Sequence, residues 1–83
     1  MEINFSNSTD DEIQNFYKQI SKKVKLLRKE KNIKQLDLAL EIGIKSVAFY
    51  SNCENNKYGK HFNLEHLYKI SKALKIDIKD FFS

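Results

Sequence analysis

The sequence lacks several features that would point to other classes of protein. It contains no proline and only two glycines, Gly43 and Gly59, so hinged or low-complexity architecture is not expected. No apolar run approaches the roughly 20 residues that a membrane-spanning helix requires. The single cysteine, Cys53, has no partner for an internal disulfide, and the first residues lack the basic and apolar regions of a signal peptide. We therefore expect a cytoplasmic protein with no membrane contact.

Charge is distributed unevenly along the chain, although the net charge is only +4. Residues 1–17 hold four acidic residues and no basic one, whereas residues 18–34 hold eight basic residues and one acid, Glu30. A basic segment of this kind suits nucleic acid or another anionic surface. A solvated, lysine-rich face of a long helix explains it equally well, so charge alone leaves both interpretations open.

Capping residues and apolar periodicity predict the first two helices. Thr9 begins a T-x-x-E capping-box pattern, and the apolar residues that follow recur every three or four positions. We expect this helix to reach about Lys31, with Asn32 as a left-handed stop. A second helix is expected from Gln35, and Gly43 ends it because glycine adopts the left-handed conformation without strain.

The segment from Val47 to Cys53 resembles a strand in composition but is predicted to be a helix. Valine, phenylalanine and tyrosine favour strands. At 100° per residue, however, Val47, Phe49, Tyr50 and Cys53 fall within one arc of about 160°. A lone strand would also have no partner in this chain. We therefore predict a short third helix over about residues 46–54.

Two further helices are expected after the polar loop NNKYGK. Asn63 offers an N-cap, and Phe62 and Leu67 have the spacing of a hydrophobic staple. Asp77 opens a short fifth helix, DIKDFF. The prediction is therefore an all-α, compact five-helix domain over residues 9–83, preceded by a flexible segment at residues 1–8.

Two short helices joined by a glycine turn form a helix-turn-helix, which requires a small residue in the turn, a small residue in the first helix where the second packs closely, and apolar residues that face inward. Gln35, Ala39, Gly43 and Ile44 supply these requirements. With VKLLRKEKNIKQLDLALEIG and FNLEHLYKISKALKIDIKDFF, the sequence resembles the Cro/cI-like (Xre-type) helix-turn-helix transcriptional regulators over about residues 23–82. The resemblance implies a lambda-repressor-like fold that binds double-stranded DNA as a dimer, with the third helix in the major groove.

The middle of the chain departs from the family pattern by one residue. Family members usually have ten steps from the turn glycine to a glutamate that ends the recognition helix, whereas Gly43 to Glu54 is eleven. Placing the extra residue in the turn, roughly GIKS, turns Tyr50 and Cys53 inward and keeps Glu54 in register. In that register the resemblance implies an ion pair between Arg28 and Glu54, which fixes the recognition helix to the scaffold.

The polar side of the third helix predicts the contacts to DNA. The residues expected to reach base edges are Lys45, Ser46, Val47, Ala48, Ser51 and Asn52. The residues expected to contact phosphate are Gln35, Asn55, Asn56, Lys57, Tyr58, Lys60 and His61. An ordinary solvent face and a lysine-bearing loop are the alternative interpretations. Several lysines of the first helix are expected to point away from DNA and to add only general attraction.

Other functions fit the sequence less well. Cys53, His61 and His66 match no standard zinc-finger spacing, so no metal or other cofactor is expected. An enzyme is not expected either, because the chain has no Gly-rich phosphate loop and no nucleophile with a base at useful spacing. The main alternative is a protein-interaction module built on the same scaffold, such as an antitoxin or a partner of another regulator.

Several roles stay open within DNA binding. A small phage-type repressor, a restriction-system controller and an antitoxin that regulates its own operon all use scaffolds of this length. The sequence does not distinguish activation from repression. The apolar candidates for a homodimer contact are Ile78, Phe81, Phe82 and the N-terminal INF segment.

Overall fold

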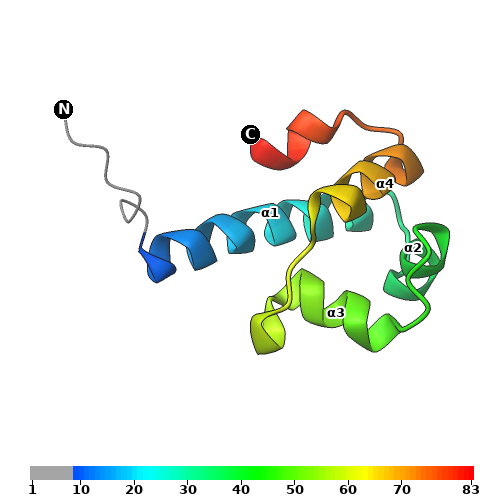
Figure 1. The fold of residues 1–83 in the computed structure, drawn as a ribbon. Coiled ribbons are helices and arrows are strands. Elements are labelled where there is room, and N and C mark those ends of the chain that lie inside the picture. The colour runs from blue at the N-terminus through cyan, green and yellow to red at the C-terminus, as the bar shows by residue number, and fades with distance from the viewer. Residues whose placement is uncertain (1–8) are drawn as a thin grey trace.

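The structure, a computed structural model, describes residues 9–83. This part of the chain forms α1 (Asp10–Glu30), α2 (Gln35–Glu41), α3 (Val47–Asn55), the 3-10 helix η1 (Lys57–Gly59), α4 (Leu64–Leu74) and the 3-10 helix η2 (Ile78–Phe82) (Figure 1). Residues 9–83 contain no strand, so the all-α prediction is confirmed for them. None of their helices is both long and apolar enough to cross a membrane. The predicted flexible segment, residues 1–8, lies outside the described residues.

The first helix begins and ends where its capping residues predict. The Thr9 hydroxyl accepts a hydrogen bond from the backbone N–H of Glu12 at 3.1 Å, which satisfies a free donor of the first turn. At the other end Asn32 has a φ of 58°, the left-handed conformation expected for it. The N–H of Ile33 then donates to the Arg28 carbonyl at 3.2 Å. With 21 residues, α1 is about 31 Å long at 1.5 Å per residue.

The long first helix organises the fold. It runs through the middle of the molecule, with α3 on one side and α4 and η2 on the other (Figure 1). α2 lies past the C-terminal end of α1 and packs on α3 and α4. Apolar side chains from α1 to α4 and from η2 meet in one buried cluster: Ile20, Val24, Leu38, Ala39, Ile42, Tyr50, Cys53, Phe62, Leu67, Ile70, Leu74 and Phe81.

The start of α4 has the N-cap and the hydrophobic staple that the sequence predicts, and one capping partner that it does not, His66. The Asn63 side chain accepts a hydrogen bond from the N–H of His66 at 2.7 Å. In return, Nδ1 of His66 accepts from the N–H of Asn63 at 3.1 Å, so the two residues form a reciprocal capping box. Phe62 and Leu67 are both buried in the core, as the predicted staple requires.

The C-terminal segment differs from the prediction in two ways. The expected fifth helix is a short 3-10 helix of five residues and not an α-helix. The Asp77 side chain caps it by accepting from the N–H of Lys79 at 3.0 Å. Phe81, for which the sequence allows either a place in the core or a dimer contact, is 2% exposed and belongs to the core, so it is not an exposed dimer contact. Since η2 packs against α1, Phe81 enters the core and Phe82 stays partly exposed.

Candidate nucleic-acid interface

The turn between α2 and α3 is built around Gly43. Its φ of 84° lies in the left-handed region, which glycine adopts without the strain that a Cβ would cause. The N–H of Ile44 donates to the Ala39 carbonyl at 2.8 Å and closes the C-terminal end of α2. The Ser46 hydroxyl caps α3 by accepting from a first-turn backbone N–H at 3.1 Å. Residues 42–46 thus separate the two helices.

The third helix has the register predicted from the longer turn. Tyr50 and Cys53 are fully buried, and Glu54 is nearly so. The Ser21 hydroxyl of α1 donates to the Cys53 carbonyl at 3.1 Å and ties the last turn of α3 to α1. The sequence does not predict the role of Ser21, because a serine beside an apolar stripe carries no local signal of its partner.

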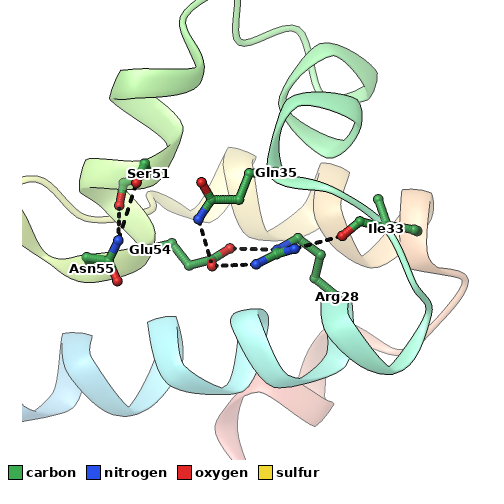
Figure 2. A network of polar contacts seen from close by, with 6 residues as sticks. All are labelled: Arg28, Ile33, Gln35, Ser51, Glu54 and Asn55. Atoms are coloured by element: carbon green, nitrogen blue, oxygen red, sulfur yellow. Dashed lines mark hydrogen bonds and ion pairs between the residues drawn. The ribbon is translucent and has the colours of Figure 1, made fainter.

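A buried ion pair joins α1 to α3 (Figure 2). Nη2 and Nε of Arg28 donate to the two carboxylate oxygens of Glu54 at 2.9 and 3.0 Å, and the side chains are 7% and 0% exposed. Nη1 of Arg28 donates to the Ile33 carbonyl at 2.7 Å. Gln35, at the start of α2, donates from Nε2 to Glu54 at 3.1 Å. Three helices therefore meet at one carboxylate.

The charges of this network are stable at neutral pH. The hydrogen bond to Glu54 raises the pKa of Arg28 above its ordinary value. Burial alone would raise the pKa of Glu54, but the hydrogen bonds from Arg28 and Gln35 outweigh it, so the Glu54 pKa lies below its usual range. Burial, together with the nearby Glu54 carboxylate, raises the pKa of Tyr50. The Tyr50 hydroxyl is buried and has no hydrogen-bond partner among the described residues.

The residues predicted to contact bases lie together on the outer side of α3 and in the turn before it. Lys45, Ser46, Val47 and Ala48 are exposed, while Ser51 and Asn52 are partly buried. Ser46 also serves as the cap of α3, a role that its prediction as a base reader did not include.

The residues predicted to contact phosphate divide into two groups. Lys57, Tyr58 and Lys60 are exposed in the loop after α3. Asn55 is exposed too, and its amide donates to the Ser51 carbonyl at 3.0 Å (Figure 2). Gln35 is partly buried because its amide bonds to Glu54, as described above.

The other two residues, Asn56 and His61, also make contacts that hold the loop in place. Asn56 has a φ of 53°, and its amide donates to the Ser21 hydroxyl at 3.1 Å. The ring of His61 stacks on Tyr17, with centroids 3.8 Å apart. Both contacts join the loop to α1. The sequence does not predict them, because they link residues that are distant along the chain.

Three lysines of α1 lie beside α3, although the sequence predicts that several lysines of the first helix point away from DNA. Lys18, Lys22 and Lys25 line a groove of about 550 Å³ together with Asn55 and other residues at the C-terminal end of α3. Their spacing of four and three residues places them on one face of the helix. That spacing was visible in the sequence, but it does not say which helix the face adjoins.

The histidines and the cysteine have structural surroundings. Cys53 is buried in the core, where burial raises the pKa of its thiol. His61 stacks on Tyr17, and His66 belongs to the cap of α4. Among residues 9–83 no group of three His, Cys, Asp or Glu side chains is placed to hold a metal ion.

Comparison with known proteins agrees with the arrangement of α2, turn and α3. The model of the family HTH_3, described as helix-turn-helix, matches residues 24–81, which is more than half of the chain. No curated protein and no solved structure matches this chain. The matched region begins within α1, so the first four turns of that helix precede it. The chain belongs to the helix-turn-helix family of Xre/Cro-like DNA-binding regulators.

Proposed function

We propose that the protein is a sequence-specific transcriptional regulator that places α3 in the major groove of double-stranded DNA and acts as a dimer on a palindromic operator. The observation that carries the proposal is the outer face of α3, which presents small and amide side chains on a helix fixed by the Arg28–Glu54 pair. A single α-helix fits the major groove, which is about 12 Å wide. A recognition helix that is already rigid loses little conformational freedom on binding.

The side chains of α3 favour an operator rich in A·T pairs. The Asn52 amide has the donor and acceptor arrangement for the N6 and N7 atoms of adenine, a contact worth about 1–3 kcal/mol of discrimination. Val47 and Ala48 suit thymine methyl groups. The face has no arginine, which is the commonest reader of guanine. Ser46 caps α3 as an acceptor and retains its hydroxyl proton for a further bond.

Phosphate contacts come from both sides of α3. Gln35 uses one amide N–H on Glu54 and retains a second for a phosphate oxygen. Asn55, Lys57, Tyr58 and Lys60 supply exposed donors in and after the last turn. We assign a supporting role to Asn56 and His61, because their contacts to α1 set the course of the loop that carries these donors.

Selection from a pool of randomised duplex DNA tests the proposal. The purified full chain is expected to enrich one palindromic site. The Asn52→Ala variant is expected to retain the site but to relax its preference at one base pair in each half-site, because one bidentate contact is lost. Lys69→Ala, which shortens an exposed side chain on α4, is the control and should enrich the wild-type site.

Failure of this experiment has a defined form. If the wild-type protein enriches no site and its weak binding disappears at moderate salt, specific reading by α3 is wrong. If a site is enriched but Asn52→Ala reads it unchanged, the orientation of α3 is wrong while DNA binding stands.

A protein-interaction module is the second candidate, favoured by apolar side chains that lie away from the outer face of α3. Ile13 and Phe16 on α1 and Phe82 on η2 are exposed, and the rings of Phe16 and Phe82 stack at 6.4 Å. Groups of exposed apolar side chains mark protein contacts more often than DNA contacts. This function predicts a protein complex that stays bound in about 0.5 M salt, because apolar contacts do not depend on charge. At physiological salt, roughly a third of that concentration, charges are already screened beyond about 8 Å.

A further inference from the structure

The groove between α1 and α3 contains more positive charge than any local pairing accounts for. Lys18, Lys22 and Lys25 line one wall, and none of them takes part in the ion pairs found within residues 9–83. The one carboxylate in the lining, Glu54, is already bound by Arg28 and Gln35. The groove therefore carries unbalanced positive charge in a concave surface, where an anion is attracted more strongly than on a convex one.

The opposite wall belongs to the proposed DNA interface. Glu54 and Asn55 in the last turn of α3, with Asn56 after it, complete the groove. Asn55 lies one turn beyond Ser51, on the outer side of the helix. A phosphate strand borders the major groove on each side, so a helix lying in that groove has a strand along its flank. The lysine wall adjoins α3 on such a flank.

We propose that Lys18, Lys22 and Lys25 form a second phosphate-binding surface, which contacts the DNA strand that runs beside α3. The inference rests on the proposed function, and its occupant is the sugar–phosphate backbone of the same duplex. Lys18 and Lys25 are seven residues apart, or about 10.5 Å along the helix. The three side chains are therefore spread over enough length to reach more than one phosphate of a strand.

This surface lies largely outside the helix-turn-helix region. Lys18 and Lys22 precede the residues matched by the family, which begin at residue 24. The N-terminal extension of α1 would thus add affinity without adding base recognition, because phosphate contacts carry no sequence information.

The salt dependence of DNA binding tests the proposal. The probe is a 30-base-pair duplex of mixed sequence, and binding is measured by fluorescence anisotropy from low to moderate salt. For the full chain with Lys18→Gln, Lys22→Gln and Lys25→Gln combined, we expect the slope of log K against log salt to become shallower by about 0.9 for each lysine that contacts phosphate. The base preferences found by selection are expected to stay unchanged.

Two sets of control variants separate the effect from total charge and from folding. The same lysines changed to arginine keep the positive charge and should keep the wild-type slope. Lys69→Gln, Lys75→Gln and Lys79→Gln together remove equal charge from α4 and the residues after it, and should change the slope much less. Circular dichroism checks that each variant retains its helices.

The outcomes distinguish this inference from the proposed function. A wild-type protein with no salt-dependent DNA binding contradicts the proposed function itself. If the wild type binds and the triple glutamine variant has the same slope, only the lysine surface is wrong. If that variant loses binding to a twelve-residue glutamate peptide while its DNA slope is unchanged, the groove belongs to an acidic protein partner and the proposal is overturned.

Discussion

At the scale of single residues, Glu54 determines how α3 packs against α1 and α2. Its carboxylate is fully buried and accepts hydrogen bonds from α1 and from α2. A buried charge is tolerated only when it is paired and its remaining hydrogen-bonding capacity is used, and both conditions hold here. Replacing either partner therefore leaves an unpaired charge in the interior.

Glu54→Gln is expected to lower the free energy of unfolding by about 3–5 kcal/mol, because Arg28 then stays buried without a counter-charge. The measurement is urea denaturation at pH 7, followed by circular dichroism. Glu65→Gln is the matched control, since the Glu65–Lys69 pair is exposed and its loss should change stability little. Equal stability of the two variants would contradict the role given to Glu54.

The same pair predicts an acid dependence. Because the pKa of Glu54 is lowered in the folded state, its stabilising contribution is fully present above the unfolded value of about 4.3 and is lost as pH falls through the folded value. The stability difference between wild type and Glu54→Gln should be constant above about pH 5.5 and decrease below about pH 4. If the stability difference between the two proteins increased as the pH was lowered, the predicted direction of the pH dependence would be wrong.

At the scale of elements, Gly43 sets the direction in which the chain leaves α2. A Cβ built at this position meets no atom within 4 Å, so a side chain here would suffer from backbone conformation and not from crowding. Gly43→Ala should lower the free energy of unfolding by about 1–2 kcal/mol. Gly43→Asn should cost less, because asparagine tolerates positive φ. Thermal unfolding of the two variants checks this order, and equal losses would contradict it.

The cap of α4 predicts a second pH dependence. Burial lowers the pKa of His66, and its neutral Nδ1 accepts the Asn63 N–H. The folded state therefore binds fewer protons than the unfolded one, and stability should fall as pH drops below about 6.5. His66→Gln supplies an acceptor that does not titrate and should flatten the melting temperature between pH 7.5 and pH 5. A variant as pH-sensitive as the wild type would contradict the assignment.

At the scale of the whole molecule, the proposed dimer predicts the molecular mass of the protein in solution. A palindromic operator needs two copies related by a two-fold axis. We expect sedimentation equilibrium to give a mass of about twice 9.8 kDa at micromolar concentration. Phe82→Ser, which removes a half-exposed ring next to Phe16, should weaken association without unfolding the chain. A monomeric mass at all concentrations would contradict the dimer that the proposed function includes.

The features that could be predicted from sequence are those with local causes. Thr9, Asn32, Gly43 and Asn63 each act through backbone groups within five residues, and each was placed correctly. The inward turn of Tyr50 follows from the helical period and from the extra residue before it. The Arg28–Glu54 contact was predicted from the family resemblance, because no local sequence pattern links residues that are 26 positions apart.

The features that could not be predicted depend on how helices cross. The burial of Phe81 requires η2 to fold back on α1, and the ties of Asn56 and His61 require the loop after α3 to reach α1. The lysine groove also needs α1 and α3 side by side. None of these contacts alters the spacing of apolar residues or the residues at helix ends. The sequence around each residue therefore does not predict them.

The sequence by itself determined the four α-helices with their approximate ends, and that two of them form a helix-turn-helix, because these properties depend on interactions across one or two turns of chain. Tertiary structure alone decided which lysines adjoin α3, which aromatic residues enter the core and how Gln35 joins the buried ion pair. These outcomes depend on the angles and distances between packed helices, which are set by the whole core at once.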